Sequence, residues 1–258
     1  MPSNDLVRNQ FNLQAANFDS WSTPKNLEYL KGCALFCGLM PEDTLLDVAC
    51  GTGDFTVFAA PSVKKAVGID ISERMIDRSW EKAEKSGLKN CTFKLGDVER
   101  LPFPDYSFSL VSCKSAFHHM PDYRKVFSEM VRCCEPGGRV ALCDIAAYDD
   151  PAIDAFFERF EKLVDASHTK TLSKEAFNRL YHENGLAIVR TFELEIQYSV
   201  TEYLSHAVQS KEDRRKLEQL YATVQQIPEI DTFWKFTGSN SEDATFKRNV
   251  FLILGTRT

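Results

Sequence analysis

The stretch Leu45–Phe55, LLDVACGTGDF, passes from an apolar run into a turn with two glycines and then into a helix. Gly51 and Gly53 let the backbone pass close to a ligand, and the N-terminus of the following helix favours anionic groups. A dinucleotide-binding turn of the form G-x-G-x-x-G needs a third glycine, but here that position is Thr56. Asp54 places a carboxylate where a pyrophosphate would lie. Both features disfavour a dinucleotide and leave the cofactor to be identified from the rest of the chain.

Strand and helix patterns alternate along residues 44–146. Strands that are apolar along their length and that alternate with helices indicate a parallel sheet covered on both faces. The expected strands are Thr44–Ala49, Lys65–Ile69, Cys91–Leu95, Phe108–Cys113 and Arg139–Ala146. The expected helices are Asp54–Ala60, Ser72–Lys85 and Asp122–Cys134.

The ends of the chain have a different pattern. Residues 1–43 have helical spacing, and residues 201–244 combine amphipathic helix with polar loop between two strand-like segments, 187–200 and 246–256. We therefore predict an α/β fold: a three-layer, Rossmann-like sheet of about seven strands, the last antiparallel, with helices on both faces. One domain over residues 1–258 would comprise a helical N-terminal cap (1–43), a cofactor-binding core (44–146) and a substrate side (147–258) with the insert 201–244.

Composition and charge narrow the class of protein. Of the 258 residues, 43% are hydrophobic, which is enough for a sizeable core, and the formal net charge is -6. A protein that grips phosphate backbones needs a basic face, so we expect no nucleic acid partner. No apolar run reaches the ~18 residues of a membrane span, and the N-terminus lacks the apolar block of a secretory signal. We expect a cytoplasmic protein without a membrane partner, and either a monomer or a homodimer.

The chain has eight cysteines, and their spacing does not resemble a metal site. No C-x-x-C pair occurs, and Cys33 and Cys37 stand four apart without a matching second pair. Most of the cysteines lie in apolar or strand-like runs. We expect reduced, mostly buried thiols and no bound metal.

Two aspartates follow the second and third expected strands. Asp70 ends the second strand in VGIDIS, where a carboxylate can accept hydrogen bonds from both ribose hydroxyls. The alternative, a helix-capping aspartate, is less favoured because Ser72 is better placed to cap. Asp97 follows the third strand, where it can accept from an adenine amino group while Val98 packs on the ring. An ordinary turn aspartate is the alternative for Asp97.

Five motifs together resemble a known family: DVACGTGD, GIDIS, GDVERLPFPDYSFSLV, SAFHHM and EPGGRVAL. In this order the chain resembles the class I S-adenosylmethionine-dependent methyltransferases. Within them it is similar to the type 11 branch, which includes the ubiquinone and menaquinone C-methyltransferases. Segments FDSW (Phe18–Trp21) and DASHTKTLSKEAF (Asp165–Phe177) resemble a bacterial and archaeal subgroup. Ser109 departs from the usual aspartate, at a strand start away from the cofactor.

The resemblance implies S-adenosylmethionine as the cofactor and a role for each matching residue. Asp70 would hold the ribose, and Ser115 and Ala116 would line the sulfonium. Asp47, Ala49, Gly51 and Gly53 would surround the methionine part, and Ile71, Met75, Asp97 and Val98 would form the adenine pocket.

Histidines are the candidate catalytic bases. His118 and His119 follow the fourth strand, at the carboxyl edge where ligands bind in such sheets. Adjacent side chains point different ways, so at most one is expected to face the substrate, and both could instead brace the cofactor loop. His168, in DASHT, follows a helix that can reach over the pocket, with a surface-loop histidine as the alternative. His182 and His206 lie in helical patterns and are interpreted as structural.

Aromatic residues gather at both ends of the chain. Phe18 and Trp21 precede the core and, with His119 and His168, are the candidate substrate-binding residues. A core role is the alternative for most aromatic residues. We expect the N-terminal helix and the insert to roof a closable apolar pocket. Further aromatic residues lie on the helix after strand five (Phe156, Phe157, Phe160) and in or beside the insert (Tyr198, Tyr203, Phe233, Trp234, Phe236).

These patterns predict an S-adenosylmethionine-dependent methyltransferase that acts on a small organic acceptor at O, N or C. Orientation of the acceptor and exclusion of water supply much of the rate enhancement, and a base is needed only where the acceptor loses a proton. Two alternatives remain: a protein or RNA methyltransferase, and a non-catalytic cofactor-binding regulatory protein.

Overall fold

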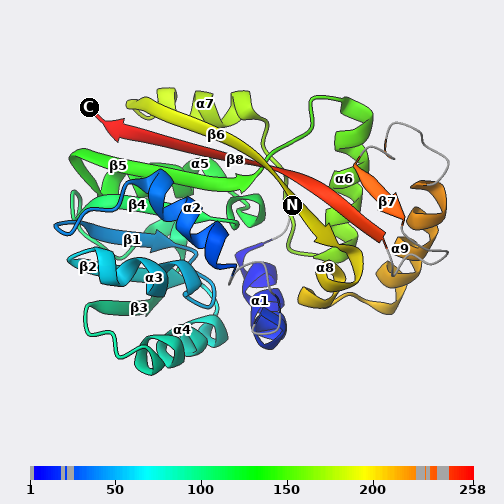
Figure 1. Cartoon of the computed structure of the whole chain (residues 1–258), viewed down its shortest axis with the longest axis horizontal. Coiled ribbons are helices and arrows are strands. Elements are labelled where there is room, and N and C mark those ends of the chain that lie inside the picture. The colour runs from blue at the N-terminus through cyan, green and yellow to red at the C-terminus, as the bar shows by residue number, and fades with distance from the viewer. Residues whose placement is uncertain (1–2, 19–20, 22–25, 225–229, 231–232, 237–243) are drawn as a thin grey trace.

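The computed structural model describes residues 3–18, 21, 26–224, 230, 233–236 and 244–258. Its described residues form one eight-stranded sheet in the order β3-β2-β1-β4-β5-β8-β6, with the short β7 paired to β8 (Figure 1). The strands are β1 (Thr44–Val48), β2 (Lys65–Asp70), β3 (Cys91–Leu95), β4 (Phe108–Lys114), β5 (Cys134–Ile145), β6 (Leu186–Ser199), β7 (Trp234–Phe236) and β8 (Ala244–Arg257).

The sheet confirms the predicted fold class. Strands β1 to β5 pair in parallel, and β8 is antiparallel to both β5 and β6. Two details differ from the expectation. The insert contributes the extra strand β7, and β5 begins at Cys134, five residues before the expected Arg139. A register shift between Phe108 and Leu110, together with the positive φ of Gly137, lets the chain bend there without leaving the sheet.

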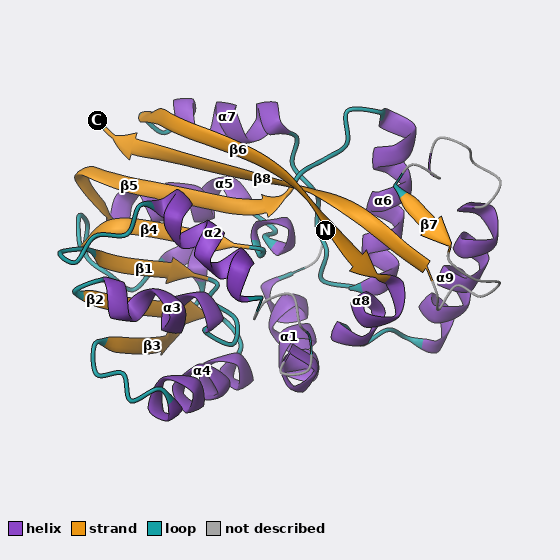
Figure 2. Ribbon diagram, in the orientation of Figure 1, coloured by secondary structure: helices purple, strands orange, loops and turns teal. Residues whose placement is uncertain are grey.

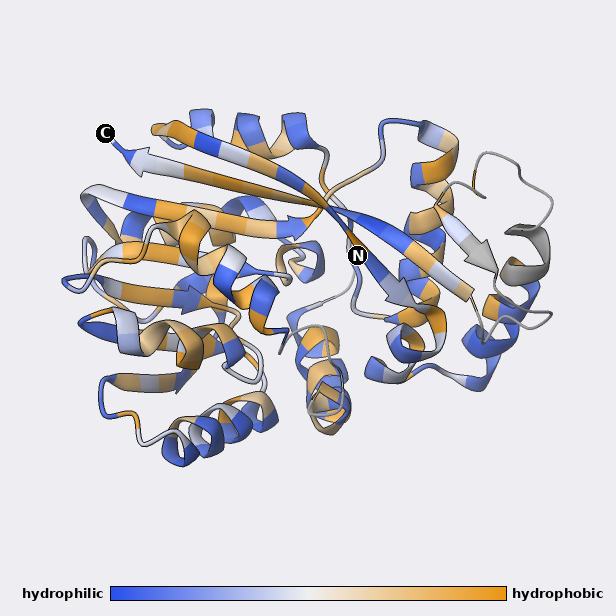
Figure 3. Ribbon diagram, viewed as in Figure 1, coloured by the Kyte–Doolittle hydropathy of each residue, from blue (hydrophilic) through white to orange (hydrophobic). Residues whose placement is uncertain are grey.

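Helices cover both faces of the sheet, as Figure 2 shows, with α2, α3 and α4 on one face and α5 and α7 on the other. The hydropathy colouring in Figure 3 shows mostly apolar central strands between amphipathic helices. The helices are α1 (Asn4–Phe18), α2 (Leu27–Cys37), α3 (Asp54–Ala59), α4 (Glu73–Lys85), α5 (Tyr123–Cys133), α6 (Pro151–Val164), α7 (Lys174–Glu183), α8 (Val200–His206) and α9 (Lys211–Val224).

Strands β6 and β8 extend beyond the other strands and carry α8, α9 and β7 beside α6 (Figure 1). An aromatic core holds this part together. Trp234 is fully buried and stacks on Phe246 of β8, with ring centroids 5.0 Å apart. Phe160 of α6 meets Trp234 edge-on at 5.1 Å. Strands β6 and β8 thus connect the main sheet to a smaller layer made of α6, α8, α9 and β7.

Helix α1 lies at the carboxyl ends of the strands, between the core and the insert (Figure 1). Polar contacts fix it to both sides. Asn12 accepts a hydrogen bond from the hydroxyl of Ser72 at 2.6 Å, whereas Gln14 donates to the carboxylate of Asp165 at 2.9 Å. Gln10 donates to the carbonyl of Val208 at 3.0 Å. The predicted N-terminal cap therefore covers the edge of the sheet at which ligands bind in this fold class.

A buried ion pair fastens α2 to the opposite edge of the sheet. The guanidinium of Arg139 contacts both carboxylate oxygens of Asp43, at 2.5 and 2.6 Å, and donates to the carbonyl of Cys37 at 3.0 Å. Asp43 is fully buried, so removing its partner leaves an uncompensated charge in the interior.

Replacing Arg139 with alanine is expected to lower the free energy of unfolding by about 3 kcal/mol, because the Asp43 carboxylate loses its counter-charge. Urea denaturation would measure this as a lower midpoint at an unchanged slope. Arg124→Ala is the matched control, since Arg124 and its partner Glu183 are exposed. Equal midpoints for the two variants would contradict the assigned role of Arg139.

Candidate functional site

A cavity of about 140 Å³ lies at the carboxyl ends of β1, β2 and β4, beneath α1. It unites most of the residues predicted from the sequence. Gly53 and His168, which were also predicted, are not among its described lining residues. The predicted residues that line it are Asp47, Ala49, Gly51, Asp70, Ile71, Met75, Asp97, Val98, Ser115, Ala116, His118, His119, Phe18 and Trp21.

Asp70 is held in place by backbone amides at the end of β2. Its carboxylate accepts from the amide of Gly51 at 2.9 Å and from the amide of Ser72 at 2.9 Å. Burial raises the pKa of Asp70, and the two amides counter that effect in part. Ser72, not Asp70, caps α4 by accepting from the amide of Met75. The carboxylate therefore faces the cavity as a fixed hydrogen-bond acceptor.

The turns at the ends of β1 and β4 contain unusual backbone conformations. Ala49 and Ser115 have φ values of 53° and 52°, in the left-handed region that costs a non-glycine residue roughly 1–3 kcal/mol. Gly51 has φ 55°, and a side chain added there would point into open space. The backbone at these three positions therefore approaches the cavity directly, which suits a ligand that binds against main-chain atoms.

Gly53 has a packing role in the structure. It caps α3 with φ 77°, and a Cβ there would lie 2.9 Å from the Cβ of Ser79 and 3.0 Å from the ring of Phe93. Glycine at this position lets the turn after β1 pack against α4. The sequence predicts that both glycines let the backbone pass close to a ligand. In the structure, Gly51 lines the cavity, whereas Gly53 packs against Ser79 and Phe93.

Asp54 is paired with a lysine at the mouth of the same turn. Lys82 contacts its carboxylate at 2.8 Å, and the hydroxyl of Thr52 donates to it at 2.8 Å. The negative charge that was expected to repel a pyrophosphate is therefore largely neutralised. The missing third glycine disfavours a dinucleotide more strongly than Asp54 does, since Thr56 at that position is buried and donates to the carboxylate of Asp47 at 2.6 Å.

Asp47 lies at the floor of the cavity, near the end of β1. Burial raises its pKa to about 6, and hydrogen bonds from Thr56 and Ser112 act in the opposite direction. Asp97 lies at another wall, accepts from the amide of Glu99, and also accepts from the side chain of Asn4 at 3.1 Å. Helix α1 thus contacts the residue that the sequence places beside an adenine.

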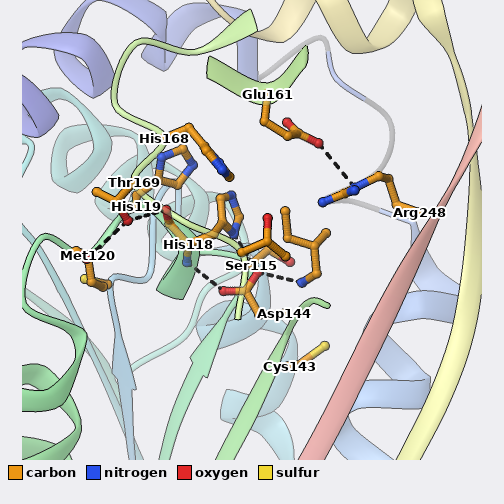
Figure 4. Close-up of polar contacts among 12 residues, drawn as sticks. Ser115, His118, His119, Met120, Cys143, Asp144, Glu161, His168, Thr169 and Arg248 are labelled. Atoms are coloured by element: carbon orange, nitrogen blue, oxygen red, sulfur yellow. Dashed lines mark hydrogen bonds and ion pairs between the residues drawn. The ribbon is translucent and has the colours of Figure 1, made fainter. Parts of the chain in front are cut away.

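The three candidate histidines form one cluster (Figure 4), with ring centroids 4.1, 5.6 and 6.3 Å apart. His118 contacts the buried carboxylate of Asp144 through Nδ1 at 2.6 Å, and its own amide donates to the second oxygen at 3.1 Å. Burial disfavours the charged imidazole, but the Asp144 carboxylate outweighs it and raises the pKa of His118. His118 and Asp144 therefore form a hydrogen-bonded acid–base pair at the cavity wall.

The other two histidines have different surroundings. Burial, together with the neighbouring His118, lowers the pKa of His119 to about 3, so this imidazole is neutral near pH 7. Its Nδ1 lies 2.9 Å from the hydroxyl of Ser167, and Phe11 of α1 packs edge-on against its ring at 4.9 Å. His168 is 2% exposed and contacts the carboxylate of Glu158 at 3.2 Å, behind the first two histidines.

The cavity wall opposite the cofactor motifs is aromatic. Trp21 stacks on His206 with ring centroids 4.2 Å apart, and Phe18 meets Trp21 edge-on at 5.4 Å. Tyr198 and Tyr203, at the junction of β6 and α8, also line the cavity. Within the FDSW segment, residues 19–20 lie outside the described residues, as does the side chain of residue 236 in the insert.

Among the residues of the site that sequence reasoning missed, four bear on its chemistry: Tyr29, Lys114, Asp144 and His206. Three of them line the cavity, and Asp144 pairs with His118 behind its wall. A signal existed for Asp144, an acid near the carboxyl end of a central strand, and for Lys114, the last residue of β4. His206 was interpreted as structural because only the folded insert brings α8 to the cavity.

The eight cysteines are free thiols, of which seven are buried and Cys50 is half-buried. Within the described ranges, no group of three or more histidine, cysteine or acidic side chains is arranged to hold a metal ion. None of the described helices combines the length and the apolar composition that a membrane span requires.

Fold and site together define a Rossmann-like protein that binds a nucleoside cofactor at the carboxyl edge of its sheet. Residues 39–219 match the family described as "Methyltransferase domain", and the chain belongs to this family of S-adenosylmethionine-dependent methyltransferases. The residues present fit that cofactor, because a fixed carboxylate at Asp70, an open backbone at Gly51 and an apolar wall at Ile71 and Met75 surround one cavity.

Individual relatives agree with this assignment. The uncharacterized methyltransferase YcgJ of Bacillus subtilis is 33% identical over 159 residues, which cover 61% of this chain and 63% of that protein. Its crystal structure superposes with a TM-score of 0.79 at 27% identity, covering 89% of this chain and 98% of that one. The sequence match therefore covers less than two thirds of the length of YcgJ, whereas the structural superposition covers 98% of the YcgJ chain.

Two relatives carry names that state a substrate. A demethylmenaquinone methyltransferase of Listeria monocytogenes is 30% identical over 172 residues, covering 63% of this chain and 73% of that protein. The 27-O-demethylrifamycin SV methyltransferase of Amycolatopsis mediterranei is 35% identical over 155 residues, covering 58% of this chain and 57% of that protein. Both names describe methyl transfer to small molecules.

Proposed function

We propose that this protein methylates a hydroxyl group of a small, neutral, ring-bearing acceptor. The observation that carries the proposal is the hydrogen-bonded pair of His118 and Asp144, because His118 lines the same cavity as the cofactor motifs and the aromatic wall. A base at this place suits an acceptor that must lose a proton as it is methylated. The two relatives named for demethylmenaquinone and 27-O-demethylrifamycin SV support a small acceptor.

Each part of the cofactor would have partners of matching chemistry. Asp70 would accept from the ribose hydroxyls, Asp97 from the adenine amino group, and Lys114 would offer a positive charge to the methionine carboxylate. S-adenosylmethionine supplies, when bound, a methyl group activated by a positively charged sulfur. The protein's own residues then have to orient the acceptor, exclude water and remove one proton.

His118 is the residue suited to remove that proton. Asp144 accepts from Nδ1 and also from the backbone amide of His118, so the ring is held in one orientation. In the neutral tautomer with hydrogen on Nδ1, Nε2 is free to accept a proton from an acceptor hydroxyl. Asp144 then stabilises the imidazolium that forms. His119, neutral near pH 7, would line the acceptor's path without competing as a base.

Helix α1 and the aromatic wall would exclude water from the reaction. Phe11 of α1 packs on His119, and Phe18 at the end of α1 packs on Trp21. The cavity walls around these residues are largely apolar, which favours an uncharged acceptor over a charged one. A roof of this kind also favours a small acceptor over a protein or an RNA, and the net charge of -6 points the same way.

Incubation with radiolabelled S-adenosylmethionine and a panel of simple acceptors tests the proposal. We expect label to be transferred to phenols and naphthols as methyl ethers, at rates well above those for the matched anilines and for ring compounds without a hydroxyl group. The hydroxyl preference follows from the need for a base. Equal transfer to hydroxyl-free analogues, or transfer to anilines alone, would refute hydroxyl methylation.

A further inference from the structure

A second cavity lies outside the site described above. It is an open groove of about 780 Å³ between α2 and the edge strand β6, on the sheet face that carries α2. We call it the α2–β6 groove. Its described lining comprises Asn26, Glu28, Tyr29, Gly32, Cys33, Leu35 and Phe36 from α2 and its cap, Arg190, Phe192, Leu194, Glu195, Ile196, Gln197 and Tyr198 from β6, together with Glu202 and Leu252.

The groove meets the cofactor cavity at two tyrosines. Tyr29 and Tyr198 line both cavities, so they form the wall between them. The hydroxyl of Tyr29 lies 3.3 Å from that of Ser115, the residue with positive φ at the end of β4. A ligand in the groove would therefore reach, past these two side chains, the place at which the acceptor's reacting group has to lie.

Much of the lining of the groove is apolar. Phe36, Leu194, Ile196 and Leu252 provide aliphatic and aromatic surface, and Phe192 stands opposite Leu252 in the strand pairing. The mouth leaves large apolar side chains in contact with water, since Leu35 is 78% exposed and Phe192 56% exposed. Exposed apolar surface that is contiguous with a ligand cavity indicates a binding function.

Four charged side chains also line the groove: Arg190, whose guanidinium lies over the ring of Phe36, and the three glutamates Glu28, Glu195 and Glu202. Glu28 and Glu195 form salt bridges with Lys31 and Lys247, at 2.9 and 2.8 Å, and the apolar part of the lining favours burial of methylene groups. From Tyr29 to Phe36, α2 advances about 10 Å, which suits an extended chain more than a second ring system.

We propose that the α2–β6 groove binds the apolar chain of an amphiphilic methyl acceptor, whose hydroxyl-bearing head lies beyond Tyr29 and Tyr198. This inference rests on the proposed function and names the class of acceptor: a ring with a hydroxyl group and an alkyl or similar unbranched apolar tail. Continuity with the cofactor cavity is what distinguishes this occupant from a second copy of the chain.

A homologous series of 4-alkylphenols, from phenol to 4-hexylphenol, tests the proposal by calorimetric titration in the presence of S-adenosylhomocysteine. Affinity is expected to rise about fourfold for each added methylene, because each one buried in the groove leaves water. Binding is the readout, so the result does not depend on turnover.

Two variants of β6 localise the effect. Phe192→Glu places a charge on the groove, and the gain in affinity per methylene is expected to disappear. Val189→Glu is the matched control, because Val189 is 57% exposed on the same strand and lies outside the described lining of the groove. The control should retain the dependence on chain length.

The outcomes separate this proposal from the proposed function. Affinity that is independent of chain length in the wild type, or lost equally in both variants, overturns the groove assignment even where phenol itself is methylated. Chain-dependent binding without methyl transfer to any member of the series supports the groove and refutes hydroxyl methylation. A wild-type dimer that Phe192→Glu converts to a monomer in sedimentation, without alkylphenol binding, would make the groove an interface between copies and overturn the proposal.

Discussion

Replacing Asp70 with alanine is expected to weaken S-adenosylmethionine binding about 100-fold. The variant removes an ionised acceptor for two hydroxyl groups, and each hydrogen bond to a charged group contributes about 1.5 kcal/mol or more. It also frees the amides of Gly51 and Ser72, which the carboxylate holds in place. Isothermal titration calorimetry measures the affinity directly and does not depend on an acceptor.

Two further variants separate recognition from folding. Asp70→Asn retains the shape and one acceptor oxygen, so its affinity should fall between those of the wild type and Asp70→Ala. Asp77→Ala, on the exposed face of α4, is the matched control and should bind as the wild type does. Unchanged affinity in Asp70→Ala would mean that the carboxylate supports the turn after β1 and does not contact the cofactor.

Replacing His118 with glutamine is expected to lower kcat roughly 100- to 10,000-fold toward a hydroxyl acceptor, while cofactor affinity stays the same. The loss corresponds to removal of a positioned base. Glutamine retains the backbone amide that donates to Asp144, so the loop keeps one of its two contacts with that carboxylate. His182→Gln, at an exposed position on α7, is the matched control and should leave both kcat and cofactor affinity unaltered.

The dependence of kcat on pH tests whether His118 is the base. A base acts in its neutral form, and Asp144 raises the pKa of His118 above its ordinary value of 6.5. Activity should therefore fall as the pH decreases through a value above 6.5 and reach a plateau at higher pH. His118→Gln should lose this transition. A wild-type profile without an acid limb in that range, or a variant that keeps it, would exclude His118 as the base.

The cofactor half of the site could be predicted because it is local in sequence. The loop after β1, Asp70 and Asp97 each follow a strand directly, and parallel strands place their carboxyl ends at one edge. Once the order of strands was recognised, the residues had to converge, and the structure brings Asp70, Asp97 and Ser115 to one cavity. Ser72 likewise revealed its capping role through its position before a helical pattern.

The acceptor half could not be predicted to the same degree, because its residues come from segments far apart in the chain. Tyr29 on α2 and His206 on α8 reach the cavity only through the packing of the N-terminal helices and the insert. Helical spacing identifies these segments but does not say which face covers the sheet edge. His168 shows the converse: its position in the chain suggested contact with substrate, yet its ring lies against Glu158.

The start of β5 at Cys134 also could not be predicted from the local sequence. Pro136 and the glycines after it are typical of a loop, and the sequence therefore predicts a break before Arg139. In the structure, Cys134 pairs with Phe108, and the chain bulges before pairing resumes at Arg139 with Leu110. Pairing across a bulge depends on the neighbouring strand, which local propensity does not include.

The most direct test of the account is transfer of labelled methyl from S-adenosylmethionine into a bacterial cell extract, compared between the wild type and Asp70→Ala. We predict that the wild type places label in a low-mass, solvent-extractable product that survives treatment with protease and ribonuclease, and that Asp70→Ala at the same cofactor concentration does not. Label confined to protein or RNA, or no transfer by a wild type that calorimetry shows to bind the cofactor, would contradict it.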